Sequence, residues 1–445
     1  MIMSRKQNLS IKQNNVTSSK DSVWTPIMVL LVLGVVILLY FGGWHSLISG
    51  GWWGYLVLGY CFVSGGFLIF RLVGGHKYRP AADMGFRPKV SVILSMFNEE
   101  SAIERAVNSV LNSNYPKDKL ELIVVDDGST DGSLAVVSKL CRARRNRFSV
   151  VALECNGGKR LAVQAGVKQC SGEVIVCMDS DAVVDVNAIS NLVAPLADSS
   201  VFAVCGNAVV ANEFLPRGQG NSFVARLQKV WYADAFRLRK GIESQLGMVL
   251  CCSGVLSAYR REKFDLVVSE WVNDRFLGQQ VRVGDDRHLT NLMLRLGGKS
   301  VFQSSAVVFT VAPDSLSKFF RQQVRWARGS VWGTLFAATF FNRKTLAQKL
   351  LFYMLSFATF VAPLAFVVGV VGLVWSGSLG SFFMFGIGLL LISLLFALTD
   401  KLLVEYFSFA DIVYRLLLPL LMIPTGFVYL YGWLTPHKGS VWGTR

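Results

Sequence analysis

Residues 120–131, with the sequence LELIVVDDGSTD, decide the fold class. The first six residues form an apolar run of strand-favouring character, and the last six are the small and acidic residues that turns favour. Two other β-rich runs, Val90–Met96 and Val174–Met178, also end at polar or acidic segments, and a helical stretch follows the first of them. Strands that alternate with helices predict an α/β domain with an open, Rossmann-like sheet over about residues 85–310.

The acidic ends of these runs have two interpretations. Open α/β sheets bind ligands at the carboxyl ends of their strands. There, Asp126 or Asp127 would accept hydrogen bonds from the uracil edge of a nucleotide, and Asp179 and Asp181 would hold a hard divalent cation together with diphosphate oxygens and water. Alternatively, these residues form Asx-turns and helix N-caps. Three acidic strand ends in register favour the functional interpretation.

Two cations, Lys159 and Arg160, follow the glycine-permitted turn Asn156-Gly157-Gly158. An exposed basic turn is the commoner fate of such a pair. Next to a nucleotide site, however, both cations suit contact with a nucleotide-sugar, and we expect that role for them.

Adjacent carboxylates, Asp285 and Asp286, precede another helical stretch. Transfer of a sugar to a hydroxyl needs a general base, and Asp286 is the candidate, with Asp285 or Arg287 to tune and orient it. The alternative is an acidic helix N-cap, and one residue can serve both purposes. His288 is a rival base, but a capped helix would point it at packing or at the carboxylate pair.

Residues 316–332 mix aromatic side chains with lysine and arginine at helical spacing. One interpretation is an amphipathic helix at a membrane interface. The more specific interpretation adds that Arg325 binds the diphosphate leaving group and that a sugar ring stacks on Trp326. One helix can do both.

The composition predicts a membrane protein. With 52% hydrophobic and 17% charged residues among 445, the chain is too apolar for an ordinary soluble protein. Four apolar stretches approach or exceed the roughly 17–25 residues of a membrane span: Pro26–Phe41, Trp52–Val73, Leu350–Trp375 and Ser381–Thr399. A fifth, Leu402–Leu434, contains charges and two prolines, which predict a short helix pair or a re-entrant segment.

The distribution of lysine and arginine predicts the orientation. These residues precede the first span and follow the second, but are missing from 42–51 and 376–380, so residues 74–345 are expected in the cytoplasm. The net charge of +16 has the same origin, and we expect membrane lipids but no nucleic acid as partners. We predict a multi-pass protein of the plasma (inner) membrane that does not require an oligomer.

The predicted segments follow in chain order. They are a disordered cytoplasmic tail (1–22), two transmembrane helices (23–75), a cytoplasmic catalytic domain (76–312), amphipathic interfacial helices (313–345), C-terminal transmembrane or channel helices (346–434) and a cytoplasmic tail (435–445).

Together these motifs resemble those of the family 2 processive glycosyltransferases, which include cellulose, chitin and hyaluronan synthases and the rhizobial chitooligosaccharide synthases. The resemblance covers residues 85–335 and the flanking apolar segments, and it is carried by Asp126-Asp127-Gly128-Ser129, Asp179-Ser180-Asp181, Gly284-Asp285-Asp286 and Gln322-x-x-Arg325-Trp326. Within the class, the chain is most similar to hyaluronan synthases, through residues 284–291, Gly158-Lys159-Arg160, Gln322–Trp326 and Trp442-Gly443-Thr444-Arg445.

The resemblance implies a GT-A glycosyltransferase domain beside an α-helical transmembrane domain. It implies Mg²⁺ or Mn²⁺ bridged to the diphosphate by Asp181, Asp286 as the base, and export of the growing polysaccharide through the protein's own channel. The full set of expected substrate-binding residues is Asp126, Asp127, Lys159, Arg160, Asp179, Ser253, Gly254, Gln322, Arg325, Trp326, Trp442 and Arg445.

One position departs from the family pattern. Val255 follows Ser253-Gly254, where these synthases usually carry a proline in a turn near the acceptor. The change bears on acceptor geometry, and therefore on the sugar used. The alternative for Ser253-Gly254 is a simple strand turn.

We therefore predict a processive, inverting glycosyltransferase that polymerises UDP-sugars, with hyaluronan from UDP-GlcNAc and UDP-GlcA as the main expectation. The alternative is a single-donor β-glycan synthase that makes a chitooligosaccharide, poly-GlcNAc or a cellulose-like polymer. A non-processive lipid-carrier glycosyltransferase would not need Gln322–Trp326 beside a membrane channel, and a transporter would leave the four motifs without purpose. Donor choice depends on a few pocket contacts that the fold places.

Overall fold

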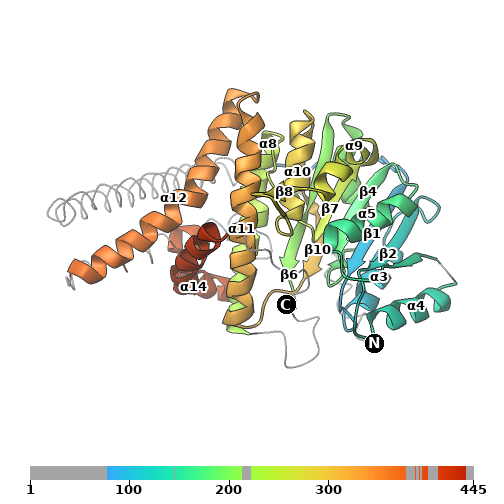
Figure 1. Ribbon diagram of the computed structural model, residues 1–445, viewed down its shortest axis with the longest axis horizontal. Helices are drawn as coiled ribbons and strands as arrows, with labels where there is room; N and C mark the ends of the chain where they lie inside the picture. Colours follow the sequence, from blue (N-terminus) through green and yellow to red (C-terminus); the bar gives the residue numbers. More distant parts are fainter. Residues whose placement is uncertain are drawn as a thin grey trace.

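A computed structural model describes residues 78–145, 147–212, 222–376, 386, 390, 393–398 and 409–436. An α/β domain lies beside three long helices, α11 (Leu316–Phe341), α12 (Leu346–Ser376) and α14 (Phe409–Leu434) (Figure 1). The predictions for the two N-terminal spans, for most of the span at 381–399, and for Trp442 and Arg445 lie outside the described residues. The boundaries of the predicted segments stay predictions.

A mixed eight-stranded sheet forms the centre of the α/β domain, in the order β3-β2-β1-β4-β7-β6-β10-β5. The strands are β1 (Val90–Met96), β2 (Leu120–Asp126), β3 (Ser149–Ala152), β4 (Val174–Asp179), β5 (Val183–Val184), β6 (Val201–Val210), β7 (Leu256–Arg260) and β10 (Lys299–Thr310). β1 is parallel to β2 and β4, whereas β7 is antiparallel to β4 and β6. The predicted α/β class is confirmed, with a mixed sheet.

The strand register brings the acidic ends together. Ser95 of β1 pairs with Val125 on one side and with Asp179 on the other. Asp126 follows Val125 directly, so Asp126 and Asp179 end strands on either side of β1 at one edge of the sheet. The expectation that acidic strand ends meet at one edge is therefore confirmed.

Helices cover the sheet and supply the loops of this edge. They are α3 (Ile103–Leu111), α4 (Ser133–Ala143), α5 (Lys159–Gln169), α6 (Ala188–Val193), α7 (Phe223–Ala233), α8 (Lys240–Gln245), α9 (Arg261–Val272) and α10 (Asp285–Arg295). The shorter elements are η2 (Ala194–Ala197), η4 (Asp234–Arg239) and the hairpin of β8 (Arg275–Phe276) with β9 (Gln279–Gln280). α5 packs on β1 and β2, and α6 and α10 pack on β6 and β10.

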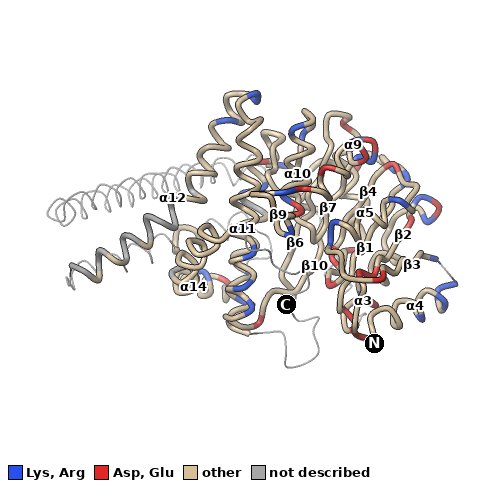
Figure 2. Tube along the Cα trace, in the orientation of Figure 1, with Lys and Arg blue, Asp and Glu red and all other residues tan. Residues whose placement is uncertain are grey.

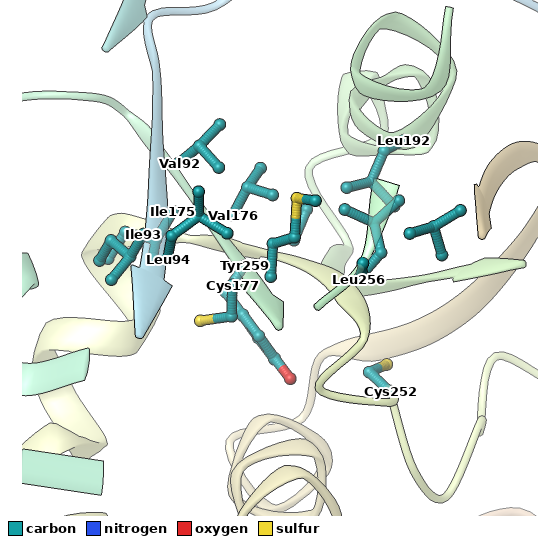
Figure 3. Close-up of a cluster of buried hydrophobic side chains, with 14 of the residues drawn as sticks. Val92, Ile93, Leu94, Ile175, Val176, Cys177, Leu192, Cys252, Leu256 and Tyr259 are labelled. Atoms are coloured by element: carbon teal, nitrogen blue, oxygen red, sulfur yellow. The ribbon is translucent and has the colours of Figure 1, made fainter. Parts of the chain in front are cut away.

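The core lies where β1, β4 and β7 adjoin. Every residue of β1 is buried, as expected for a strand that is covered on both faces. Figure 3 shows Val92, Leu94, Val176 and Leu256 pointing into this core. Each fully buried aliphatic side chain of this kind contributes roughly 1.5–3 kcal/mol, so the core keeps the strand ends of the site in place.

Charged residues concentrate in the α/β domain and on α11, whereas α12 and α14 carry few (Figure 2). In the described part of the chain, no single helix is both long enough and apolar enough to cross a membrane. Two segments joined at a 50° bend, Ala410–Leu421 and Pro424–Leu434, reach that length and composition as a pair. Pro419 and Pro424 lie inside α14, and a proline interrupts helical hydrogen bonding. The helix pair expected within 402–434 agrees with this bend.

Candidate active site

The two carboxylates at the end of β2, Asp126 and Asp127, accept hydrogen bonds from backbone N–H groups of nearby turns. The Ser129 N–H lies 3.3 Å from both carboxylate oxygens of Asp126, and the N–H groups of Gly157 and Gly158 donate to Asp127 at 3.0 and 2.8 Å. Burial raises the pKa of Asp127, and the two donated hydrogen bonds oppose this. Asp126 thus accepts from the N–H three residues on, so it forms neither a two-residue Asx-turn nor the N-cap of α4, which is Gly132. Asp127 holds the glycine turn that precedes α5. Uridine binding by either residue stays a prediction.

Lys159, in the first turn of α5, connects two acidic motifs. Its Nζ lies 2.5 Å from Asp179 Oδ1 and 3.9 Å from Asp285 Oδ2, and its side chain is 12% exposed. Burial alone would lower the pKa of Lys159, but the charges of Asp179 and Asp285 outweigh burial and raise it. Lys159 therefore remains a cation between the end of β4 and the start of α10.

The turn Ser253–Leu256 brings backbone groups to the same place. The Gly254 N–H lies 3.3 Å from Asp286 Oδ2, and a Cβ atom at Gly254 would lie 2.4 Å from Lys159 Nζ. Only glycine lets the turn approach the ammonium group this closely. The structure therefore places Gly254 between the candidate base and the cation.

Val255 does not prevent this turn from forming. The Leu256 N–H donates to the Ser253 carbonyl at 3.2 Å, and the Val255 carbonyl accepts from the Asp179 N–H at 3.4 Å. The backbone thus adopts a turn without the proline that is usual in the resembling synthases. An acceptor-binding role for Ser253-Gly254 stays a prediction.

Asp285 and Asp286 occupy the first turn of α10, which begins directly after Gly284. Asp286 Oδ1 accepts from the Arg287 N–H at 2.8 Å. Burial raises the pKa of Asp285; the nearby Lys159 opposes this, and the neighbouring Asp286 adds to it. The acidic N-terminal position is confirmed, and it leaves Asp286 Oδ2 directed at the Gly254 turn.

His288 and Arg160 lie deeper than the sequence pattern suggested. The His288 ring packs edge-on against Phe336, and its Nδ1 lies 2.9 Å from Asp274 Oδ2, so the packing alternative for His288 is confirmed. Arg160 Nη1 donates to the Trp271 carbonyl at 2.6 Å and lies 3.2 Å from the same Asp274 oxygen. The structure therefore does not bring Arg160 together with Lys159, and its contact with a nucleotide-sugar stays a prediction.

α11 presents the Gln322–Trp326 motif beside α7. The Trp326 ring centroid lies 6.1 Å from that of Trp231 and 6.2 Å from that of Tyr232. Burial raises the pKa of Tyr232, and both Arg325 and Asp179 act on it electrostatically. Tyr232 thus lies within electrostatic range of Arg325 on α11 and of Asp179 at the end of β4.

Sequence reasoning missed this contribution of α7. The adjacent aromatic residues Trp231 and Tyr232 are the available signal, but such a pair is ordinary on an amphipathic helix. Among the described residues, Gln322 Oε1 and both amide atoms of Gln323 are buried without a hydrogen-bond partner. Gln322 therefore keeps the capacity to accept a hydrogen bond, as its predicted substrate-binding role requires.

Asp179 and Asp181 flank Ser180 at the end of β4, and both are half-buried. Among the described residues, no group of three or more His, Cys, Asp or Glu side chains is arranged to hold a metal ion. Two hard carboxylates can fill part of an Mg²⁺ or Mn²⁺ shell when diphosphate oxygens and water fill the rest. The donor set therefore fits such an ion only together with a nucleotide-sugar.

Comparison with known sequences agrees with these motifs. Residues 91–267 match the family described as Glycosyl transferase family 2. An N-acetylglucosaminyltransferase of Rhizobium meliloti is 34% identical over 251 residues, which are 56% of this chain and 57% of that protein. Another, of Azorhizobium caulinodans, is 34% identical over 268 residues, which are 60% of this chain and 65% of that protein. The chain thus spans less than two thirds of the length of these relatives.

A solved structure shares the fold. A mannosyltransferase from Pyrobaculum calidifontis, in complex with GDP-Man and Mn²⁺, aligns with a TM-score of 0.61 at 20% identity, over 92% of this chain and 100% of that one. This similarity establishes a GT-A-like glycosyltransferase fold with a mixed sheet.

Proposed function

We propose, from the family 2 glycosyltransferase domain at residues 91–267, that the protein transfers N-acetylglucosamine from UDP-GlcNAc to the hydroxyl of a growing β-glycan. The relatives named N-acetylglucosaminyltransferase support this donor. They favour the single-donor, chitooligosaccharide-type synthase over hyaluronan, which was the main expectation from the sequence. The proposed polymer needs one donor, whereas hyaluronan needs two in alternation.

One observation carries the proposal: four segments that are far apart in sequence meet, in two hydrogen-bonded pairs. Lys159 bonds Asp179 and lies 3.9 Å from Asp285, and the Gly254 N–H reaches Asp286, so the starts of α5 and α10, the end of β4 and the turn before β7 adjoin at one place. A donor diphosphate at the sheet edge and an acceptor hydroxyl at Asp286 would meet there. A cation, a base and a glycine-lined approach are what glycosyl transfer needs.

Asp286 would act as the general base. The acceptor oxygen forms a bond to the anomeric carbon while the bond from that carbon to the diphosphate oxygen breaks, and the hydroxyl proton passes to Asp286. A single displacement of this kind inverts the anomeric configuration. Asp285, whose pKa burial raises, and Lys159 set the electrostatic surroundings of the base.

Cationic and aromatic groups would stabilise the leaving group and position the acceptor. Asp179 and Asp181 would hold Mg²⁺ or Mn²⁺ with the diphosphate, and the bound ion would neutralise charge on the departing UDP. Arg325, on α11, would stabilise the same negative charge on the departing UDP. Trp326, flanked by Trp231 and Tyr232, provides an aromatic surface for a sugar ring.

Processive export at the plasma (inner) membrane extends the proposal, with the catalytic domain in the cytoplasm and the polysaccharide and membrane lipids as partners. The apolar composition supports it, and so does the packing of the Gln322–Trp326 helix on α14. A Cβ atom at Gly432 of α14 would lie 2.5 Å from the Ala327 Cβ, so the two helices touch closely one residue beyond Trp326.

The test is UDP release by the purified, detergent-solubilised protein with Mg²⁺ or Mn²⁺. The donors are UDP-GlcNAc, UDP-GlcA and UDP-Glc alone, and the UDP-GlcNAc/UDP-GlcA pair, with products digested by chitinase or hyaluronidase. Sustained turnover of UDP-GlcNAc alone into a chitinase-sensitive product is expected. If the two donors together release more UDP than either alone and give a hyaluronidase-sensitive polymer, hyaluronan is the product. If no donor releases UDP, the proposed transferase activity is wrong.

A further inference from the structure

One buried carboxylate outside the sequence motifs contacts side chains from three helices. Asp274, between α9 and β8, has an 8% exposed side chain. Its Oδ2 lies 2.7 Å from Trp332 Nε1, 2.9 Å from His288 Nδ1 and 3.2 Å from Arg160 Nη1. Trp332 and Arg160 donate hydrogen bonds, whereas His288 Nδ1 lies in close contact. The three residues belong to α11, α5 and α10, and we call these three side chains and Asp274 the Asp274 cluster.

The cluster keeps Asp274 ionised inside the protein. Burial acts to raise the pKa of Asp274, but the nearby His288, the charge of Arg160 and the hydrogen bond from Trp332 lower it overall. A buried carboxylate that accepts from several donors cannot shift without leaving charged or polar groups unpaired, and such groups are costly to leave unpaired. The three helices are therefore tied to a single oxygen atom.

Each residue that contacts Asp274 lies close in sequence to a residue of the proposed site. Arg160 follows Lys159 directly, His288 lies half a turn after Asp286 on α10, and Trp332 lies about two turns after Arg325 on α11. Because a helix transmits the position of one residue to its neighbours, a movement at Asp274 would move the cation, the base and the diphosphate clamp relative to one another.

Further contacts join α10 and α11 beside the Asp274 carboxylate, so a shift of this carboxylate would change how the two helices pack. The Trp332 and Phe336 rings both pack against His288, with ring centroids 6.1 and 4.7 Å from it, and against each other at 5.9 Å. Asn291 of α10 donates to the Gly333 carbonyl of α11 at 2.9 Å. Asp274 thus adds an ionic contact to a junction where ring packing, the Asn291 hydrogen bond and the close approach of Gly284 and Gly329 also hold the two helices.

We infer that Asp274 is a positioning residue of the transfer step, which holds Asp286 and the Gln322–Trp326 helix at the separation that acceptor attack requires. This inference rests on the proposed glycosyl transfer. Asp274 itself touches neither the donor nor the acceptor site. The competing explanation is that the Asp274 cluster only stabilises the fold.

Asp274→Asn in the full chain separates the two explanations, because it keeps the side-chain size and removes the charge. The matched control is Glu270→Gln, which removes a carboxylate four residues earlier from an exposed pair with Arg295. With UDP-GlcNAc and Mn²⁺, kcat for transfer should fall about 100-fold in Asp274→Asn, as for a misplacement of about 1 Å, while KM for the donor stays unchanged. The share of UDP-GlcNAc hydrolysed by water rather than transferred should rise, and Glu270→Gln should match the unmodified protein.

Unchanged kcat and hydrolysis share in a folded Asp274→Asn protein, with only the melting temperature lowered, would overturn the inference. If Asp274→Asn does not fold, Trp332→Phe removes one donor and keeps the ion pairs. In Trp332→Phe we expect kcat to fall clearly while the melting temperature changes little. An unchanged kcat in that variant would also overturn the inference.

Amide hydrogen exchange distinguishes failure of this inference from failure of the proposed function. If the unmodified protein releases no UDP from any donor, the proposed function fails. In that case Asp274→Asn should still speed exchange at the starts of both α10 and α11, and Glu270→Gln at neither. Exchange confined to the hairpin β8–β9 would refute the Asp274 cluster as the link between the helices.

Discussion

Gly284 and Gly329 meet backbone to backbone where α11 crosses the start of α10. A Cβ atom on Gly329 would lie 2.9 Å from the Gly284 Cα, and Gly284 itself has a φ of 66°, a conformation that favours glycine. This contact sets how closely the helix of Gln322–Trp326 approaches Asp285 and Asp286.

Replacing Gly329 by alanine should therefore separate α10 and α11. The added methyl group meets backbone atoms that cannot rotate away, so we expect a loss of roughly 1–3 kcal/mol in the free energy of unfolding and a fall of about 100-fold in transfer. Gly386→Ala is the control, because a Cβ there meets nothing within 4 Å among the described residues. Thermal melts and UDP release would measure both effects, and equal behaviour of the two variants would contradict the packing argument.

Asp286→Asn should abolish transfer and keep nucleotide binding. Loss of a general base lowers the rate by roughly 10²–10⁴-fold, while the UDP site at the sheet edge is left intact. Titration calorimetry with UDP and a UDP-release assay separate the two quantities. Asp265→Asn, on the exposed side of α9, is the matched control. Full activity in the Asp286 variant would remove it as the base.

Gly254→Ala should weaken donor binding while changing the free energy of unfolding little. The new Cβ would lie 2.4 Å from Lys159 Nζ, the mobile end of a long side chain, so the lysine moves and its bond to Asp179 is lost. We expect an increase of about tenfold in KM for UDP-GlcNAc, which corresponds to the loss of one charge-assisted hydrogen bond. A KM equal to that of the unmodified protein would show that Lys159 does not contribute to donor binding.

Trp326→Ala should shorten the product. Removing the ring eliminates the stacking surface shared with Trp231 and Tyr232, so the acceptor should dissociate after fewer additions. Product length by mass spectrometry measures this at equal UDP release. Phe223→Ala, a half-exposed aromatic on α7, serves as the control. Unchanged product length in the Trp326 variant would argue against the stacking role.

A buried thiolate should make stability depend on pH. Burial opposes ionisation of Cys205, but the hydrogen bond from Cys252 and Lys240 Nζ at 3.0 Å outweigh it and lower the pKa of Cys205 to about 6. Because this pKa lies below that of an unfolded thiol, the pair contributes most above the ordinary thiol pKa and loses its contribution as the pH falls through about 6. The melting-temperature difference between the unmodified protein and Cys205→Ser should be largest near pH 8.5, shrink as the pH falls toward 6, and change no further below it. A difference that is independent of pH would show that Cys205 is a neutral thiol.

Much of the α/β domain followed from local pattern. Val90–Met96 and Leu120–Val125 are apolar runs bounded by turn residues, and both are strands in the structure. The acidic ends of β2 and β4 were predicted to meet because neighbouring strands end at one edge of a sheet. Motif spacing also identified Asp286 and Trp326 as candidates. The contacts of Asp274 were not predictable, because a single acidic residue between two elements has no periodic signature.

The sequence by itself determined the class of fold, the family 2 motifs and the apolar character of the C-terminal part, because each depends on residue type and spacing along a short stretch. Only the tertiary structure decided which motif residues share a space. In the tertiary structure Lys159 bonds Asp179, and the Gly254 N–H reaches Asp286. Gly329 packs against Gly284. Arg160 and His288 are buried and both contact Asp274. These contacts join segments that are distant along the chain, and their geometry depends on how the helices pack on the sheet.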